Sequence, residues 1–586
     1  MSEAPREAPI PSNNITPVDT ATEIVNMEEF NENIDDQFKD PNAPQEGVSE
    51  RQKWGSRISF LFASIGAAIG FGNFFRFPYL VFSSGGGAFL IPYTFALIFI
   101  GVPLLLMETA IGQFTRRASF KGMRILHRRS GGIGLSASAF GGFAVSSYYC
   151  VMLSWVCVYF IHCFRYDLPW AGRADEFFRV SWPVFGGLLF VWVIVYVCVW
   201  RGVKSTGLVA YVTVPLPFIL LFILLGRALF LEGAVQGIVY YLYPDFSLLL
   251  DARIWLAAAG QIFFSLGIGS GTMTAFGSFN DENQDVVSDN LIICIAETSF
   301  SLFAGFAVFS ILGYMAHERG VTVPEVTASG IGLAFVVFPD AVSLMPIPHV
   351  FAVLLFVTMF TLGIDSAVGL TESVNGVIHD QFHKVPLSVI SLIVCIAGFV
   401  AGIPFTLTNG FYLMDIVDHF VSDYCLIFVG ICECIVVGYL IATTPLLQKI
   451  KETQALIREH GMSKLYSFLL YANVLLFHSA DEFRQKMSAV SKRGPTRIWS
   501  LLIKFLIPLL LGGIWLSQII KEMIHPYSSL PDGSFDRVSL AVGCIIVISC
   551  ISVVVIFIFI PGKGSKKAQE PEQVVIEEIA NAFDAN

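Results

Sequence analysis

Charged residues are scarce in this sequence. Only 14% of the 586 residues are Asp, Glu, Lys or Arg, whereas 55% are hydrophobic and the mean hydropathy is +0.68. This composition excludes an ordinary soluble globular protein. Apolar runs repeatedly reach the roughly 20 residues that cross the hydrocarbon core of a bilayer. The chain is therefore predicted to be an all-α polytopic protein embedded in a lipid bilayer.

Signatures of several other protein classes are also missing. The sequence holds no Ser/His or Cys/His constellation, zinc-ligand spacing or phosphate-binding loop, so no catalytic residue is expected and the chain is predicted not to be an enzyme. The 11 cysteines are scattered singly and are interpreted as small packing residues. The net charge of -10 comes largely from acidic stretches at the two ends, which predict solvated tails and no nucleic-acid partner. The first 50 residues lack the apolar core of a cleavable signal peptide, so the first apolar run is expected to act as the membrane address.

About twelve apolar segments are predicted to span the membrane. They cover approximately residues 56–81, 88–112, 135–164, 183–200, 205–231, 253–279, 286–315, 344–374, 385–404, 410–441, 499–520 and 537–560. Lys and Arg gather before the first segment, after the second, between the fourth and fifth, before the eleventh and after the last. Positive charge favours the cytoplasmic side, so both termini are predicted to be cytoplasmic.

Two of these segments contain residues that interrupt a helix. The first, "SIGAAIGFGNFFRFPY", holds three glycines together with Asn73, Arg76 and Pro78. The sixth, "GQIFFSLGIGSGTMTAFGSFN", has glycines at alternate positions in its middle. The two segments open two successive five-helix halves, which is the pattern of a transporter built from inverted repeats with broken helices at its binding site. Small residues for close helix packing are the alternative, but the register of the pair and its polar residues favour unwound segments that line a cavity.

Ionisable residues within other apolar segments support a functional site, because they are costly in a membrane. Asp365 and Ser366 lie in the eighth segment and offer the oxygen ligands that a sodium ion accepts, and Glu297 lies in the seventh. A buried carboxylate that only pairs with a neighbouring helix is the alternative for each.

The motifs "WGSRISFLFASIGAAIGFGNFFRFPYL", "GGGAFLIPY", "GVPLLLMETAIGQF", "GQIFFSLGIGSG", "GFAVFSILGYMA", "LGIDSAVGLTES" and "DIVDHF" occur in this order. Together they resemble the neurotransmitter:sodium symporter family over roughly residues 51 to 560. The resemblance implies a 5+5 inverted repeat with helices one and six unwound at mid-membrane, two extra helices, and a sodium-coupled carrier of a small amino-bearing solute that works by alternating access.

The resemblance also implies site residues. For one sodium ion they are Gly66, Ile69, Leu362, Asp365 and Ser366. For a second they are Ala68, Asn73 and Ser265, with Glu297 at a ligand position. For the substrate they are Ala68, Gly70, Gly72, Val145, Tyr149, Phe264, Ser265, Gly267, Ser270, Ser366 and Leu370, with Ala367 as a further wall. For the chloride-like site they are Tyr93, Gln261, Ser265 and Ser301. The outer gate is Arg76 with Asp418, and the inner gate is Arg51 and Trp54 with Asp380.

Substrate class is predicted from charge. Monoamine carriers of the family have an aspartate where this chain has Gly70, so a substrate that brings its own carboxylate, an amino acid, is favoured here. Ser270 replaces an aromatic residue of the pocket wall, and the added space and hydroxyl favour a large neutral or polar side chain. Phe279 replaces a tyrosine of the inner gate, so the inner closed state is expected to be less tightly latched.

Glu297 stands where the family usually has an asparagine, and two interpretations are open. A carboxylate there can replace chloride in the charge balance, which predicts chloride independence and leaves sodium as the coupling ion. Alternatively, burial keeps Glu297 protonated and the carrier couples to protons. A non-transporting amino-acid sensor, or a carrier of another small amine or osmolyte, are the competing functions.

The predicted layout has an acidic, disordered cytoplasmic tail over residues 1–50, a transporter domain over 51–560 and a cytoplasmic tail over 561–586. Within the domain, the repeats cover about 54–231 and 253–441. A cytoplasmic insertion covers about 442–490, and the two last helices cover 499–560. The family default places the protein in the plasma membrane. The sequence predicts no oligomeric state.

Overall fold

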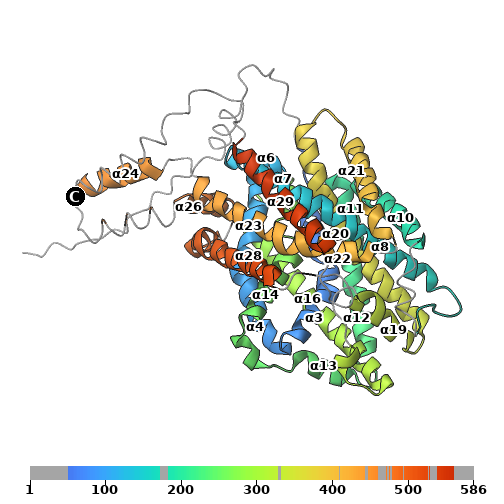
Figure 1. Cartoon of the computed structure of the whole chain (residues 1–586). Coiled ribbons are helices and arrows are strands. Elements are labelled where there is room, and N and C mark those ends of the chain that lie inside the picture. The colour runs from blue at the N-terminus through green and yellow to red at the C-terminus, as the bar shows by residue number, and fades with distance from the viewer. Residues whose placement is uncertain are drawn as a thin grey trace, which may run out of the picture. The chain divides into compact units, whose positions relative to one another are not determined.

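The computed structural model describes residues 51–171, 182–326, 332–407, 410–441, 446–459, 478–491, 494–524 and 537–559, together with Ser467, Leu470, Val474 and Tyr527. All of them belong to one compact unit, Gly47–Asn586. The described residues form helices and connecting turns without a strand (Figure 1). The two predicted tails lie outside the described residues.

The helices of the first predicted repeat follow one another through short turns. They are α2 (Arg57–Ala68), η1 (Gly72–Arg76), α3 (Phe77–Ser83), η2 (Gly86–Phe89), α4 (Leu90–Ala96), η3 (Leu97–Gly101), α5 (Val102–Thr115), α6 (Ser119–Leu126), α7 (Gly131–Ser136), η4 (Ala137–Ala144), α8 (Val145–His162), α10 (Trp182–Val199), α11 (Val203–Thr213) and α12 (Pro215–Ala228). Here η marks a tighter or wider turn inside a helical run. Two short elements, α13 (Ala234–Leu242) and η5 (Phe246–Leu250), lead to the second repeat.

The second repeat and the remaining elements are again helical. They are α14 (Ala252–Ser265), α15 (Thr272–Gly277), α16 (Val286–Arg319), α17 (Val323–Val326), η6 (Leu333–Val337), α19 (Phe338–Ser343), α20 (Pro348–Gln381), α21 (Leu387–Gly402), η7 (Ile403–Thr406), α22 (Gly410–Phe420), η8 (Val421–Cys425), α23 (Leu426–Ile435), η9 (Val436–Leu440), α24 (Leu446–Glu459), α26 (Ala480–Val490), α27 (Arg497–Leu501), η10 (Leu502–Leu506), α28 (Ile507–Ile524) and α29 (Arg537–Phe559).

The predicted all-α polytopic membrane protein is confirmed. Among the described residues, nine helical runs are long and apolar enough to cross a membrane, and the pair α2 and α3, bent by 53°, counts as a tenth. The fourth predicted segment corresponds to α10, and the sixth to the two short helices α14 and α15. The eighth helix extends beyond its predicted end near residue 374 to Gln381, because its last turns are too polar for a hydropathy window to include.

Both predicted interruptions are present, and each has a local cause. Helix α2 ends at Ala68, and Ile69 adopts an extended conformation at φ -96° and ψ 107°. Gly267, Gly269 and Gly271 between α14 and α15 all have positive φ, at 64°, 78° and 71°. Only glycine adopts such angles without steric cost, so the alternate glycines of the sixth segment end one half-helix and allow the next to begin.

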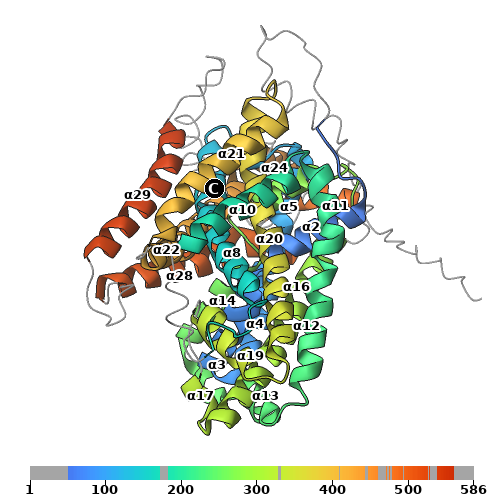
Figure 2. The same ribbon diagram turned by 90° about the vertical axis from the view of Figure 1, so that its right-hand side faces the viewer.

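Helices α16 and α20 run through the middle of the described helices, and α2, α5, α8 and α15 pack on one or both of them. Figure 2 shows α28 and α29 on one side of this group and α11 and α12 on the opposite side. The central helices carry Glu297 and Asp365, so both carboxylates lie inside the helical bundle.

The predicted insertion contains the described helices α24 and α26. Helix α26 is attached to the bundle through Phe483, which packs against Phe114 of α5 and Trp499 of α27. Most of the predicted interfacial segment between the two helices lies outside the described residues.

Candidate functional site

The break in the first helix is held open by side chains rather than by helix hydrogen bonds. The Asn73 Oδ1 accepts the N–H of Gly70 at 2.9 Å, and the N–H of Phe71 donates to the Tyr149 hydroxyl at 3.2 Å. Freed backbone groups at the centre of a membrane protein are tolerated only where they have such partners or line a cavity. The break therefore presents carbonyls and N–H groups to the interior.

Four of the residues predicted for the first sodium ion lie together on the inner side of the break. The Ser366 hydroxyl lies 3.5 Å from the carbonyl oxygens of both Gly66 and Ile69. A Cβ added at Gly66 would lie 2.8 Å from the Asp365 Oδ2, so this carboxylate directly faces the end of α2. Leu362 is buried one turn before Ser366 in α20. Carbonyl, hydroxyl and carboxylate oxygens converge here, as a sodium ion requires.

The residues predicted for the second sodium ion and for chloride form a single cluster around Glu297. The Asn73 Nδ2 donates to the Glu297 Oε1 at 2.6 Å and lies 2.9 Å from the hydroxyls of Ser265 and Ser301. The Ser265 hydroxyl also donates to the Glu297 Oε1, and the Ser301 hydroxyl does so at 3.2 Å. The Tyr93 hydroxyl approaches the Glu297 Oε2 at 3.4 Å. The Glu297 carboxylate thus occupies donors that would otherwise face a small anion.

Two further members of these sets have different surroundings. The Gln261 amide is directed at the Gly72 carbonyl, 3.5 Å away, and not at Glu297. Ala68 is the last residue of α2, where the break begins, and its side chain is buried.

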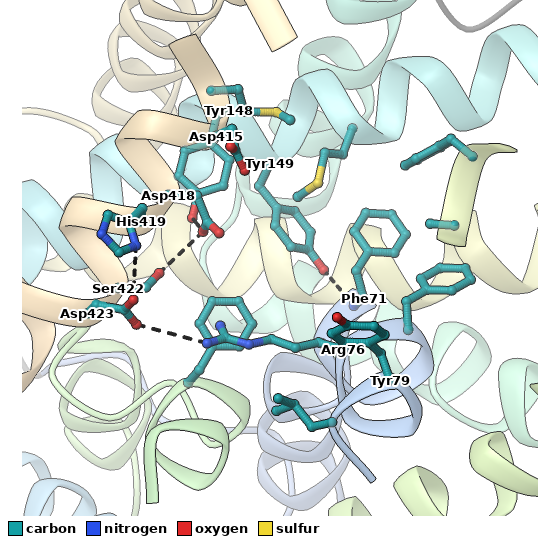
Figure 3. Close-up of a pocket in the computed structure, with 18 of the residues that line it drawn as sticks. Phe71, Arg76, Tyr79, Tyr148, Tyr149, Asp415, Asp418, His419, Ser422 and Asp423 are labelled. Atoms are coloured by element: carbon teal, nitrogen blue, oxygen red, sulfur yellow. Dashed lines mark hydrogen bonds and ion pairs between the residues drawn. The ribbon is translucent and has the colours of Figure 1, made fainter. Parts of the chain in front are cut away.

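Three predicted substrate residues line a cavity of about 300 Å³, namely Gly72, Tyr149 and Phe264. Figure 3 shows Tyr149 among the residues that line it. A Cβ added at Gly70 would lie 2.7 Å from the Tyr149 Oη and 2.8 Å from the Ser366 Oγ, so position 70 faces these two hydroxyls. The close approach requires glycine at position 70 and places the Tyr149 hydroxyl where it can meet a bound carboxylate.

The other predicted substrate residues do not line this cavity. They are Ala68, Gly70, Val145, Ser265, Gly267, Ser270, Ser366, Ala367 and Leu370. The Ser270 hydroxyl donates to the Gly267 carbonyl at 2.6 Å and accepts the N–H of Thr272 at 3.3 Å. The Ser270 hydroxyl was expected to face a substrate, but it stabilises the start of α15 instead. Of the two effects predicted for Ser270, the free hydroxyl is absent, and the smaller side-chain volume remains a prediction.

The outer gate differs from its prediction. Arg76 and Asp418 both line the cavity, but the ion pair of Arg76 is with Asp423 at 4.0 Å, and its guanidinium lies 4.6 Å from the centre of the Phe264 ring. Asp418 accepts hydrogen bonds from Tyr148 at 2.5 Å and from Ser422 at 3.2 Å (Figure 3). Arg76 therefore stands between two possible carboxylate partners one to two turns apart.

The three residues predicted for the inner gate lie close together. Arg51 forms an ion pair with Asp380, whose side chain is only 3% exposed, and lies 4.7 Å from the centre of the Phe279 ring. Burial lowers the pKa of the Arg51 guanidinium, and the charge of Asp380 opposes this shift. The Trp54 N–H donates to the Phe279 carbonyl at 3.1 Å, and the Trp54 Nε1 donates to the Phe276 carbonyl at 3.0 Å. The aromatic face of Phe279 contacts Arg51 where the family has a tyrosine.

Comparisons with known proteins show the family of this chain. The profile of the Sodium:neurotransmitter symporter family matches residues 51–179 and 172–478. The chain belongs to this family. It is 35% identical over 447 residues to the Sodium- and chloride-dependent GABA transporter 2 of Bos taurus, covering 68% of this chain and 74% of the relative. It is 35% identical to the creatine transporter of Torpedo marmorata over 68% of this chain and 73% of the relative. An uncharacterized sodium-dependent transporter of Methanocaldococcus jannaschii is 37% identical over 69% of this chain and 85% of the relative.

This symporter is therefore a sodium-dependent transporter and not an enzyme, and its membership in the family confirms the resemblance read from its motifs. Two features of its site were missed by sequence reasoning. Thr213 of α11 donates to the Asp365 Oδ1 at 2.6 Å, and His419 of α22 lies between two carboxylates. A threonine in an apolar helix commonly bonds its own backbone, so only the fold identifies Thr213 as a partner of Asp365.

Proposed function

We propose that this symporter imports an amino acid together with sodium, and that Glu297 supplies the negative charge that chloride supplies in chloride-dependent relatives. The observation that carries the proposal is the bonding of the Glu297 carboxylate. Its oxygens accept from Asn73, Ser265 and Ser301 and approach the Tyr93 hydroxyl. A chloride ion would need the same hydroxyls, so carboxylate and chloride compete for one set of donors.

Charge balance supports the same conclusion. Two sodium ions bring two positive charges, Asp365 and Glu297 bring two negative charges, and a zwitterionic amino acid adds none. Chloride would leave one uncompensated negative charge in the interior, where unpaired charges are costly. The site is thus neutral with sodium and substrate alone.

The break in the first helix supports a substrate with a carboxylate. The Phe71 N–H donates to the Tyr149 hydroxyl beside the cavity, and neither group carries a negative charge that would repel a carboxylate. Gly70, next to Phe71, supplies no carboxylate to bind a substrate amine. GABA and creatine, the solutes in two relatives' names, both carry a carboxylate.

Side-chain size is proposed from the sixth helix. Ser270 is smaller than the aromatic residue of the family pattern, and its hydroxyl is bonded to its own segment, so it offers no free polar group to a substrate. Val145 and Ala367 are buried near the same interior, and Leu370 is partly buried. This combination favours a large neutral amino acid.

Topology completes the proposal. The basic loops favour a cytoplasmic position for both termini, the two tails and the insertion near residues 442–490. The inner gate of Arg51 and Asp380 then faces the cytoplasm, and the cavity at Arg76 opens to the outside of the plasma membrane. Closed inner contacts with an outer cavity describe one end state of an alternating-access cycle.

The first experiment is a thermal-stability screen of the detergent-purified protein against the twenty amino acids, GABA and creatine, in sodium chloride and in choline chloride. A ligand at about 100 times its dissociation constant adds roughly 2.7 kcal/mol to the folded state. Stabilisation by large neutral amino acids in sodium alone is expected. Stabilisation that ignores sodium would contradict the coupling, and stabilisation by GABA or creatine alone would contradict the substrate class.

The second experiment tests Glu297 by uptake of the identified substrate into proteoliposomes, with chloride replaced by gluconate. Wild-type uptake is expected to be unchanged by the replacement. Glu297→Gln removes the charge and frees the hydroxyls, so its uptake is expected to require chloride. Glu372→Gln is the matched control, because Glu372 is also buried but bonds Thr206, at 3.0 Å, away from this cluster. Chloride dependence in the wild type, or equal chloride rescue of both variants, would refute the role of Glu297.

A further inference from the structure

His419 in the last turn of α22 lies between two carboxylates. Its Nδ1 is 3.1 Å from the Asp423 Oδ2, and its Nε2 is 3.5 Å from the Glu522 Oε2 of α28. The ring of Tyr527 stacks on the imidazole at 4.0 Å between ring centres, with 13° between the planes. The ring is therefore fixed with one nitrogen toward each carboxylate.

This geometry suits the two protonation states of the imidazole differently. A neutral imidazole has one N–H, so it can donate to only one of the two carboxylates, whereas the imidazolium donates to both. Glu522 has other donors, since the Tyr527 N–H lies 2.8 Å from its Oε1 and the Tyr424 hydroxyl 3.3 Å from its Oε2. Among the described residues, the cationic side chains in ion-pair contact with Asp423 are His419 and Arg76. When the imidazolium loses its proton, Asp423 therefore loses one of its two cationic partners, whereas Glu522 keeps its other donors.

Asp423 lies between His419 and Arg76, as Figure 3 shows. The other charged or titratable groups around the imidazole come from several elements. They are Asp415 and Asp418 on its own helix, Tyr424 on η8, Lys521 and Glu522 on α28, Tyr527 after α28, Tyr148 on α8 and Cys544 on α29. The other α29 residues that pack here are apolar, namely Val542, Ile546 and Val547. Among these groups, the only firm positive charges are Arg76 and Lys521, so the protonation of His419 changes a local balance dominated by carboxylates.

We propose that Asp423 is a second gate carboxylate for Arg76, and that His419 is a positioning residue whose protonation decides which carboxylate Arg76 binds. When His419 is protonated, it neutralises Asp423, and Arg76 is free to reach Asp418 and close the gate. When His419 is neutral, Asp423 holds Arg76, and the cavity stays open. Acidic external pH therefore favours closure. The gating role of this inference rests on the proposed alternating-access function, whereas the experiment that tests it does not require transport.

The test is hydrogen–deuterium exchange of the full-length purified protein without substrate. It compares about pH 6 with about pH 8.5, either side of the ordinary histidine pKa near 6.5, with intrinsic exchange rates corrected. Peptides that cover residues 72–83 report the outer half of the first helix. Their exchange is expected to be about threefold slower at the lower pH, on the scale of a partly exposed ion pair. Two variants separate the states: His419→Lys keeps a positive charge and is expected to exchange slowly at both pH values, and His419→Gln is expected to exchange fast at both.

Asp423→Asn provides an independent check, because it also removes the pH response and leaves Arg76 free at both pH values. A wild type without a pH response, or a His419→Gln protein that keeps the wild-type response, overturns the proposal. Thermal unfolding of each variant shows whether it has folded. A failed amino-acid screen would refute the transport proposal alone, since the exchange experiment contains no substrate.

Discussion

The inner and outer gates use the same kind of ion pair in opposite surroundings. The inner pair, Arg51 with Asp380, has side chains only 9% and 3% exposed, and Arg51 also lies on the Phe279 ring. The outer pair, Arg76 with Asp423, is at 4.0 Å with side chains 33% and 25% exposed, beside a cavity of about 300 Å³. A buried pair becomes costly when one partner is lost, whereas an exposed pair contributes little. The Arg51–Asp380 pair is thus buried and costly to break, whereas the Arg76–Asp423 pair is partly exposed and weak.

The two gates also differ in their choice of partner. Asp380 is held by several groups at once, because its Oδ2 accepts the Ala118 N–H at 2.7 Å and its carbonyl accepts from Lys121. Arg76 has a second carboxylate, Asp418, within the same cavity. The inner latch is thus specified by many contacts, whereas the outer latch can exchange partners at low cost.

The largest expected effect is at the inner gate. Arg51→Gln leaves Asp380 buried without its cation, which is expected to destabilise the latched state by about 3–5 kcal/mol. Hydrogen exchange of peptides covering residues 51–60 is then expected to be at least roughly a hundredfold faster. Lys53→Gln is the matched control in the same segment, because the Lys53–Asp281 pair has side chains 55% and 67% exposed. Equal acceleration in both variants would show that burial does not distinguish the pairs.

The second prediction concerns the hinge between the gates. Gly70→Ala places a Cβ 2.7 Å from the Tyr149 Oη and 2.8 Å from the Ser366 Oγ, so both hydroxyls must move. Overpacking of this kind costs about 1–3 kcal/mol, and we expect stabilisation by sodium and amino acid to disappear in the thermal assay. Gly260→Ala is the control, since a Cβ there has no neighbour within 4 Å. Retained sodium-dependent stabilisation in Gly70→Ala would place the binding site elsewhere.

The third prediction isolates the aromatic part of the inner latch. Phe279→Leu removes the ring face below Arg51 but keeps the backbone carbonyl that accepts from Trp54. A cation–π contact contributes about 0.5–2 kcal/mol, so exchange over residues 51–60 should accelerate less than in Arg51→Gln. Phe62→Leu, which removes a ring packed on Tyr211, measures the general cost of losing a phenyl group. If the Phe279 and Phe62 variants behave alike, the Arg51 contact contributes nothing specific.

The sequence predicted the features whose cause is local. The alternate glycines of the sixth helix need positive φ, and the polar residues of the first helix need partners, so both breaks could be expected without a fold. The sequence also predicted Arg51, Trp54 and Asp380 as an inner gate, but only through the family resemblance and not through any local pattern. For the two breaks, residues close in sequence determine the structure, whereas Arg51 and Asp380 lie 329 positions apart in the sequence.

Features that depend on contacts between distant helices were not predictable. Asp418 and Asp423 are five residues apart, and only the packed positions of α22, η8 and η1 make Asp423 the partner of Arg76. Thr213 could bond the carbonyl of Val209, which it does at 3.0 Å, and its additional bond to Asp365 depends on how α11 meets α20. Ser270 was assigned to the substrate pocket by position, but its hydroxyl turns toward its own backbone.

The smallest expected effect is at the outer gate, where the change made at the inner gate is repeated. Arg76→Gln removes an exposed ion pair at 4.0 Å and the contact with Phe264, so stability should fall by no more than about 1 kcal/mol. Exchange over residues 72–83 and the thermal midpoint should both remain near wild type, while amino-acid uptake is lost because the gate cannot close over its substrate. Asp423→Asn is the control that removes one partner and leaves Arg76 able to use Asp418, so its uptake should persist. A loss of stability in Arg76→Gln as large as in Arg51→Gln would mean that the outer gate is as firmly latched as the inner one.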